Sequence, residues 1–382
     1  MASLKLAAGR KARVLHGHPW IFAGEVTKRL PPACDGTPVT ARDANGRPLG
    51  TGFYNGQSQI VWRRLSRDPV EITPAFFQGR IAAAIARREP GEVRRLVWSE
   101  ADGLPGLVVD QFGSALSVQI TTLGMERNLT SLLEALDAVI HPERLVLRND
   151  TPVRVKEGLG QEIRVVRGSP EPFWCRIGLV EFEIDLVGGQ KTGAYLDQRQ
   201  EYEQIARLAA GRRVLDLCCN QGGFALHAAM AGARDVVGID SSETALAQAR
   251  KNAERLGLSV RWIEANVFDW LRTHRKETFD LVILDPPPLG KSKAGMGGAL
   301  DGYRDLNLRA LRLLGPQGLL ATYTCSHRVT REGFEDMLAK ITGEVERDLR
   351  LIRRVEQPND HPILMNFPES EYLRGAIVEV VP

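Results

Sequence analysis

In the second half of the chain, short runs of apolar residues alternate regularly with amphipathic stretches. The apolar runs have the length of buried strands, and the stretches between them are long enough for helices. The predicted strands are 213–217, 235–240, 259–264, 279–285 and 319–325, and the predicted helices are 222–231, 243–256, 267–275, 301–314 and 331–341. Such alternation predicts a parallel, doubly wound α/β sheet with right-handed crossovers. Two more extended stretches, 349–355 and 375–381, predict a terminal hairpin.

The first half lacks this alternation and predicts two smaller domains. Short β-type runs separated by Gly-containing turns such as Asn45-Gly46 predict a small β-barrel over residues 1–68. The clearest of these runs are 38–41 and 59–62. A central α+β domain is expected over 69–170, with helices near 74–88 and 125–139 and extended runs at 107–110 and 115–120. The α/β domain then occupies 171–382.

The composition is that of a globular protein. Its 382 residues are too many for one ordinary core, and 43% of them are hydrophobic and 25% charged. No apolar run approaches the length of a membrane span, and the start of the chain lacks the apolar core of a signal peptide. The five cysteines show neither even pairing nor a CxxC spacing. We therefore expect a cytoplasmic protein with no metal site.

The charge of the chain is unevenly distributed. The net charge is +3, but residues 1–70 contain far more basic than acidic side chains. The basic residues there are Lys5, Arg10, Lys11, Arg13, Lys28, Arg29, Arg42, Arg47, Arg63, Arg64 and Arg67, and the acidic ones are Glu25, Asp35, Asp43 and Asp68. A basic module ahead of a nearly neutral body indicates a docking domain for a polyanion. A solvated basic face without a partner is the alternative.

Two predicted strands end in chemically useful side chains. Cys325 ends the apolar run 319–325, and Asp285 ends the preceding strand before a rigid proline turn. Ligands of open parallel sheets bind outside the carboxyl ends of the strands. A thiol and a carboxylate delivered there from neighbouring strands suggest covalent chemistry, with the acid orienting a substrate. The alternative is that Cys325 is a small core residue.

The first strand–helix turn of the α/β domain predicts a cofactor site. Its small and glycine residues, up to Gly222, permit close approach of a ligand, but the dinucleotide fingerprint G-x-G-x-x-G is absent. Asp216 comes too early to serve a pyrophosphate and would repel one. A carboxylate there suits a cationic ligand such as the amino-acid end of S-adenosylmethionine. Asp240 ends the second strand, where a carboxylate can accept hydrogen bonds from a ribose.

These residues resemble the class I S-adenosylmethionine-dependent methyltransferases. The resemblance narrows to the bacterial 23S rRNA 5-methylcytosine methyltransferases with an N-terminal PUA domain. The matching segments are His18-Pro19-Trp20, Lys191 to Arg199, Asp216 to Phe224, Asp240-Ser241, Asp285-Pro286-Pro287 and Thr324-Cys325-Ser326. The segment from Lys191 to Arg199 and the Thr-Cys-Ser sequence are the specific parts, because many methyltransferases share the others.

The resemblance implies a function and a set of site residues. It implies methyl transfer from S-adenosylmethionine to C5 of a cytosine in 23S rRNA, with Cys325 as the nucleophile and Asp285 stabilising the ring. The implied cofactor-binding residues are Lys191, Thr192, Tyr195, Asp216, Asn220, Gly222, Asp240, Ser241, Asn266 and Asp285. The partner would be 23S rRNA or a precursor of the large ribosomal subunit, with no membrane involved. A homodimer is one option for the assembly state.

The chain departs from the family pattern at two places. The usual Gly-x-Gly of the first turn is Cys218-Cys219-Asn220, and Pro288 stands where a second cysteine would follow the two prolines. Pro288 and Leu289 are also not the aromatic residues with which amino-methylating enzymes stack their base. Two alternatives remain: methylation of guanine N2 or another exocyclic amine, and a non-catalytic ribosome assembly factor that keeps the cofactor pocket.

Several other residues have a structural and a functional interpretation. For Trp20, Tyr54 and Trp62 in the predicted barrel, we favour a core position over stacking on RNA bases. For Cys218 and Cys219, we favour space-filling next to the cofactor turn. His327 as a proton shuttle and Asp360-His361-Pro362 near the active site are left open.

Overall fold

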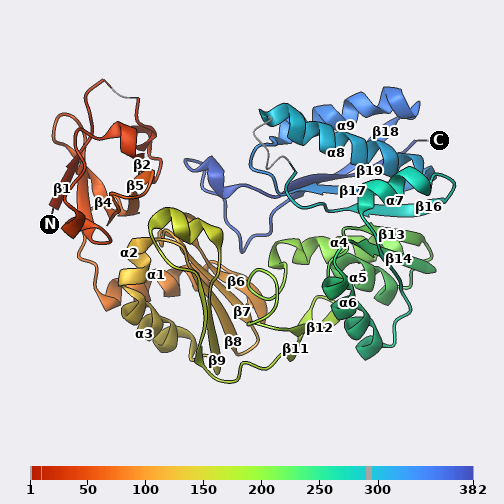
Figure 1. Cartoon of the computed structure of the whole chain (residues 1–382), viewed down its shortest axis with the longest axis horizontal. Coiled ribbons are helices and arrows are strands. Elements are labelled where there is room, and N and C mark those ends of the chain that lie inside the picture. The colour runs from red at the N-terminus through yellow and green to blue at the C-terminus, as the bar shows by residue number, and fades with distance from the viewer. Residues whose placement is uncertain (1, 10, 290–294, 382) are drawn as a thin grey trace. The chain divides into compact units, whose positions relative to one another are not determined.

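The computed structural model describes residues 2–9, 11–289 and 295–381, with side chains omitted at 295–297 (Figure 1). It divides into two compact units that are discontinuous in sequence. Unit 1 contains Met1–Phe173, Ile184–Leu196 and Asn359–Ser370, and unit 2 contains Trp174–Glu183, Asp197–Pro358 and Glu371–Pro382. Within the described ranges, no helix combines the length and apolar character that crossing a membrane requires.

Unit 1 begins with a small β-domain, as the spacing of its short strands predicts. Its sheet has the order β1-β3-β4-β5-β2. The strands are β1 (Ala2–Lys5), β2 (Trp20–Phe22), β3 (Pro38–Arg42), β4 (Pro48–Tyr54) and β5 (Ile60–Ser66). Tyr54 and Trp62 are completely buried in its core, which confirms the structural interpretation of both. Trp20 is half-buried, and its indole N–H donates to Glu100 Oε1 at 2.6 Å.

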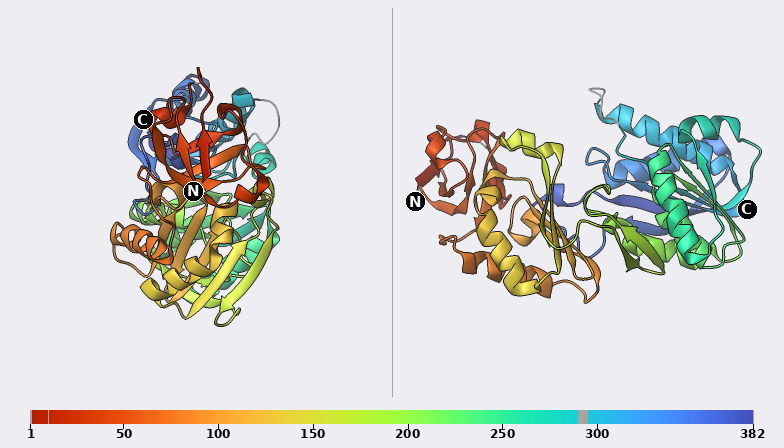
Figure 2. Two further views of the ribbon diagram at one scale, coloured as in Figure 1. Left: turned by 90° about the vertical axis from the view of Figure 1, so that its left-hand side faces the viewer. Right: turned by 60° about the horizontal axis from the view of Figure 1, so that its bottom comes forward.

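The second part of unit 1 is a five-stranded sheet with helices on one face (Figures 1 and 2). The strand order is β10-β9-β8-β7-β6. The elements are α1 (Pro74–Ala86), β6 (Val93–Trp98), β7 (Leu107–Phe112), β8 (Ala115–Ile120), α2 (Leu123–Arg127), α3 (Leu129–Ile140), β9 (Arg144–Asn149) and β10 (Glu162–Arg167). α1 and α3 share one apolar core with the strands. The single helix predicted over 125–139 is wrong in detail, because Asn128 separates α2 from α3.

Unit 2 contains the predicted doubly wound sheet. Its seven strands have the order β15-β14-β13-β16-β17-β19-β18. They are β13 (Arg213–Leu217), β14 (Asp235–Asp240), β15 (Arg261–Glu264), β16 (Phe279–Leu284), β17 (Leu314–Thr324), β18 (Leu349–Glu356) and β19 (Arg374–Val380). The first five are parallel, and β19 is antiparallel to β17 and β18. The fold class predicted from the sequence is confirmed.

Helices cover both faces of this sheet, with α4, α5 and α6 on one side and α8 and α9 on the other (Figure 1). The helices are α4 (Arg199–Ala209), α5 (Gly223–Met230), α6 (Glu243–Leu256), α7 (Val267–Thr273), α8 (Gly295–Arg312) and α9 (Arg331–Val345). A preceding pair, β11 (Phe173–Ile177) and β12 (Val180–Ile184), forms a separate two-stranded sheet. Apolar residues from the strands, α7, α8 and α9 form one continuous core.

Three details of the sequence prediction are corrected. β17 begins at Leu314 rather than 319, because Leu314 pairs with Phe279 across a register shift, in spite of the turn-like Gly-Pro that follows it. α8 begins at Gly295 rather than 301, since a glycine-rich start gives no helical signal. The sequence prediction omits α4, because the sequence of this helix is mainly polar even though five of its residues are buried. The predicted terminal hairpin pairs as expected, although residues 357–373 separate its strands.

Candidate active site

The carboxyl ends of four parallel strands bring the predicted chemistry to one edge of the sheet in unit 2. Asp216 lies near the end of β13, and Asp240 ends β14. Asp285 and Cys325 directly follow β16 and β17, which pair in parallel. Because all four strands run in the same direction, these side chains share the edge at which α/β proteins bind ligands.

Asp216 is a fully buried carboxyl group. Its Oδ2 accepts a hydrogen bond from the backbone N–H of Ala225 at 3.0 Å, at the start of α5. Its Oδ1 has no hydrogen-bond partner within the described part of the chain. Burial, together with the charges of Asp285 and Asp240, raises the pKa of Asp216 to about 8. A buried carboxylate with one unused oxygen fits a cationic ligand, because a positive charge would compensate its desolvation.

The turn after β13 adopts a glycine-like backbone without the usual glycines. Cys218 and Asn220 have φ angles of 64° and 49°, in the left-handed region that glycine prefers. Gly222, at φ 86°, must be glycine, since a Cβ atom there would lie 2.7 Å from the ring of Trp262. The turn therefore uses left-handed backbone at positions 218 and 220, although both carry side chains.

Asp240 joins this turn to the start of the next helix. Its Oδ2 accepts from the backbone N–H of Asn220 and its Oδ1 from that of Ser242, both at 2.9 Å. Each carboxylate oxygen can accept a second hydrogen bond, so a ribose hydroxyl can still bind. Ser241 is exposed beside this carboxylate, and the Ser242 hydroxyl caps α6 by accepting from Ala245 N.

Asn266 has a structural role as well as its predicted one. It is the N-cap of α7, and its Oδ1 accepts from the backbone N–H of Phe268 at 2.9 Å. The residue is exposed. Capping uses its oxygen, so its amide N–H groups could donate to a ligand.

Asp285 has a neighbour whose role the sequence did not indicate. The Nε2 amide of Gln198 donates to Asp285 Oδ2 at 3.0 Å. Gln198 is 3% exposed and lies directly before α4, at the end of a short 3₁₀ turn, Leu196–Gln198. The only sequence signal for it is its place inside the segment from Lys191 to Arg199 that carries the family resemblance.

Cys325 is half-buried between two buried hydroxyl residues. The backbone N–H of Ser326 donates to Thr324 Oγ1 at 3.2 Å, which fixes the turn that follows β17. Tyr303, from α8, is also buried, close enough to Thr324 and Cys325 to interact with both. Burial raises the pKa of Tyr303 to about 12, and the negative charge of a Cys325 thiolate adds to the shift. Tyr303 therefore remains a neutral phenol beside the thiol, and the sequence gives no sign of it.

Three predicted cofactor residues belong to unit 1 and not to unit 2. The Lys191 ammonium group lies 4.0 Å from the centre of the Tyr195 ring, and the Tyr195 hydroxyl donates to Gln190 Oε1 at 2.8 Å. The buried Thr192 hydroxyl donates to Asp110 Oδ2 at 2.6 Å. Their contact with a cofactor stays a prediction.

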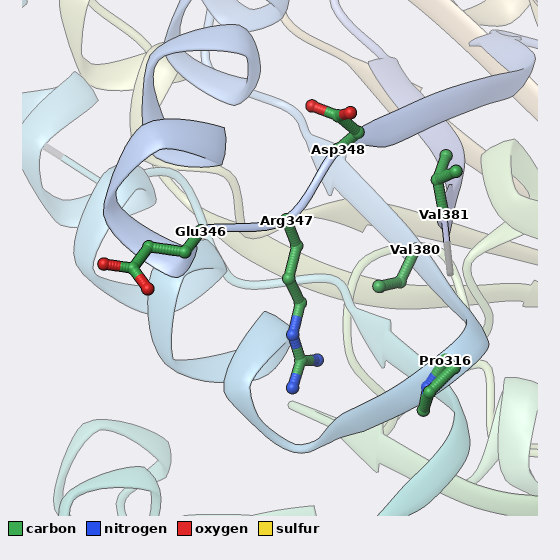
Figure 3. Close-up of a pocket in the computed structure, with 6 residues that line it drawn as sticks. All are labelled: Pro316, Glu346, Arg347, Asp348, Val380 and Val381. Atoms are coloured by element: carbon green, nitrogen blue, oxygen red, sulfur yellow. The ribbon is translucent and has the colours of Figure 1, made fainter.

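A surface pocket of about 330 Å³ lies at the opposite edge of the same sheet (Figure 3). It is lined by Pro316, Glu346, Arg347, Asp348, Val380 and Val381. Pro316 is near the start of β17, and Val380 ends the antiparallel β19. The pocket is thus at the amino ends of the parallel strands and away from Asp285 and Cys325.

Comparison with known proteins identifies the family. Residues 4–67 match a family model for a PUA-like domain, and residues 163–368 match one for S-adenosylmethionine-dependent methyltransferases. The protein named ribosomal RNA large subunit methyltransferase I of Photobacterium profundum is 37% identical over 390 residues, 98% of each chain. The chain belongs to the ribosomal RNA large subunit methyltransferase I family. Its namesake from Aeromonas salmonicida is 36% identical, also over 98% of each chain.

Solved structures support the same fold. A proposed methyltransferase crystallised with SAH matches with a TM-score of 0.85 at 20% identity, over 100% of both chains. A proposed S-adenosylmethionine-dependent methyltransferase from Streptococcus mutans matches with a TM-score of 0.83 at 21% identity, again over 100% of both chains. The resemblance inferred from the sequence is confirmed, and the chain is an S-adenosylmethionine-dependent methyltransferase with an N-terminal PUA-like domain.

Proposed function

We propose that the protein transfers a methyl group from S-adenosylmethionine to C5 of a cytosine in 23S rRNA through a covalent adduct on Cys325. The observation that carries this proposal is the placement of Cys325 and Asp285 after two adjacent parallel strands, at the edge that also carries Asp216 and Asp240. The names of the relatives support large-subunit rRNA as the substrate. An exocyclic amine can be methylated without a covalent step, so an amino methyltransferase has no use for this thiol.

The residues of unit 2 fit the cofactor. The unused Oδ1 of Asp216 would face the cationic amino-acid end, and Asp240 would accept from the ribose. Gly222 keeps the turn open for backbone contact, with Asn220, Ser241 and the amide of Asn266 close to the same edge. S-adenosylmethionine supplies an electrophilic methyl group when it is bound. From unit 1, we propose Lys191, Thr192 and Tyr195 as further contacts.

A thiol is needed because C5 of cytosine is a poor nucleophile. Addition of the Cys325 thiolate to C6 breaks the C5–C6 double bond and makes C5 electron-rich. Asp285, sharing a proton with N3, stabilises the charge that develops on the ring. After methyl transfer, loss of the C5 proton to a base and departure of the thiolate restore the aromatic ring. The target cytosine must leave any stack of bases to reach this edge, as in other enzymes that modify nucleobases.

The test is trapping with a fluorinated substrate. RNA with 5-fluorocytosine at the target position should form a stable adduct, because fluorine cannot leave as the proton does. Mass spectrometry should map the adduct to the peptide that contains Cys325, and Cys325→Ala should lose methyl transfer while cofactor and RNA binding are kept. An adduct on Cys218 or Cys219 would move the nucleophile to the cofactor turn. Full activity of Cys325→Ala would contradict the proposal and favour amine methylation.

A further inference from the structure

We propose that Gln198 is a positioning residue for methyl transfer, which holds Asp285 so that its Oδ1 carries the proton shared with the target base. This inference rests on the proposed function of Asp285. It assigns different roles to the two oxygens of one carboxyl group, and it gives a reaction role to a residue on the turn before α4.

The geometry of Gln198 points toward Asp285 and away from its own helix. Gln198 occupies the N-cap position of α4, but its side chain makes no capping hydrogen bond. Its Nε2 instead donates to Asp285 Oδ2 at 3.0 Å. The side chain is 3% exposed, so water does not compete for this bond.

The hydrogen-bond chemistry decides which oxygen holds the proton. An amide N–H can only donate, so Asp285 Oδ2 must accept. In a neutral carboxylic acid, the carbonyl oxygen is a much better acceptor than the hydroxyl oxygen. A proton on Asp285 is therefore favoured on Oδ1, and the fixed Oδ2 also sets the plane in which Oδ1 meets the substrate.

A purely structural role explains Gln198 poorly. Its Oε1 is buried and has no hydrogen-bond partner among the residues that the structure describes. A buried acceptor without a partner lowers stability, and an apolar side chain of similar size would avoid this cost. The amide is thus retained at a site where it is unfavourable for the fold and useful for Asp285.

The experiment compares Gln198→Met with wild type in a tritiated methyl-transfer assay on full-length protein. Methionine has a similar length and removes the donor. We expect kcat to fall by about 10- to 100-fold, as loss of orientation at a reacting group does, while the KM for RNA and the Kd for SAH change by less than about twofold. Gln204→Met is the matched control, because Gln204 is half-buried on the same helix. An unchanged kcat in Gln198→Met would overturn the proposal.

A double-mutant cycle tests whether Gln198 acts through Asp285. In an Asp285→Asn background, Gln198→Met should lower the single-turnover rate by less than about twofold. An effect of the same size in both backgrounds would contradict the proposal. If thermal unfolding shows that Gln198→Met does not fold, Gln198→Asn replaces it. The asparagine side chain is too short for its amide to reach Asp285 Oδ2, so we expect the same loss of kcat. A wild-type kcat in this variant would contradict the proposal. The product is identified separately: a wild-type product other than 5-methylcytosine refutes the proposed function, whereas coupling between the two residues is read from rates alone.

Discussion

The buried carboxyl group of Asp216 predicts that cofactor binding depends on pH. Its pKa is raised to about 8 by burial and by the charges of Asp285 and Asp240. In the free protein near neutral pH, Asp216 is therefore mostly protonated. A cationic amino-acid end placed at its unused Oδ1 would favour the carboxylate, so binding should release a proton and strengthen as the pH rises toward 8.

The size of the effect follows from the fraction of Asp216 that is ionised. With a free-state pKa of about 8, the carboxylate makes up about 1% of molecules at pH 6 and about a quarter at pH 7.5. If only the ionised form binds well, affinity should rise about 20-fold over this interval, which corresponds to about 1.8 kcal/mol. Affinity must increase with pH and not decrease, because the ligand binds to the form of Asp216 that has lost its proton.

Isothermal titration calorimetry with SAH can test this prediction. Titrations at pH 6 and pH 7.5, each in two buffers of different ionisation enthalpy, give both the affinity and the number of protons released. Asp216→Asn has nearly the same shape and does not titrate, so its affinity should be weaker than that of wild type and independent of pH over this range. If wild-type protein binds SAH equally well at both pH values and releases no proton, the amino-acid end of the cofactor does not meet Asp216.

Two further predictions concern the ribose and the RNA. Asp240→Ala should weaken S-adenosylmethionine binding by about 1–3 kcal/mol in calorimetry, because ribose hydroxyls lose a charged acceptor and the backbone N–H groups of Asn220 and Ser242 lose theirs; unchanged affinity would place the ribose elsewhere. Lys11 and Lys28 are exposed on the N-terminal β-domain, so replacing both by Glu should weaken RNA binding and lower the slope of log affinity against log salt by about 2. An unchanged slope would show that these lysines do not contact phosphates.

The fold of unit 2 could be predicted because its core residues follow a regular alternation of apolar strands and amphipathic helices. Strands buried on both faces read as apolar runs, and the helices between them have the expected lengths. Errors occurred where tertiary contacts override local signals. The start of β17 contains Gly315 and Pro316 yet still pairs with β16, and α4 is held by packing although its sequence is mainly polar.

The candidate site was predictable to the extent that its residues follow strands. Asp240, Asp285 and Cys325 each stand at the end of an apolar run, so the topology alone brings them together. Gln198 reaches the same edge from a turn, and Tyr303 reaches it from α8. The sequence around each residue does not predict that its side chain lies at the site. Side chains that arrive through tertiary packing are therefore the part of this site that required the structure.

Counting charges in the sequence also overstated the basic surface. Arg63 donates to Glu100 and Glu157 inside unit 1, and Arg64 donates to the carbonyl oxygen of Gly17 at 2.7 Å. Arg13 pairs with Glu369 at 2.6 Å. These arginines stabilise the fold or are neutralised, and Arg10 lies outside the described residues. The exposed cations on this domain are therefore fewer than the eleven basic residues in its sequence.

If the proposed function is correct, the basic residues that bind RNA and the acidic residues that act in methyl transfer lie in different domains. Asp216, Asp240 and Asp285 bring three carboxyl groups to the catalytic edge, and these groups can accept hydrogen bonds or a positive charge from the cofactor but offer no positive charge to RNA phosphates. Affinity for a polyanion must then come from elsewhere, and exposed lysines such as Lys11 and Lys28 on the PUA-like domain can supply it. An uncharged base, taken out of its stack, needs no cation in order to approach these carboxyl groups. The carboxyl groups would thus serve the cofactor and the nucleobase, while the exposed lysines bind the RNA backbone.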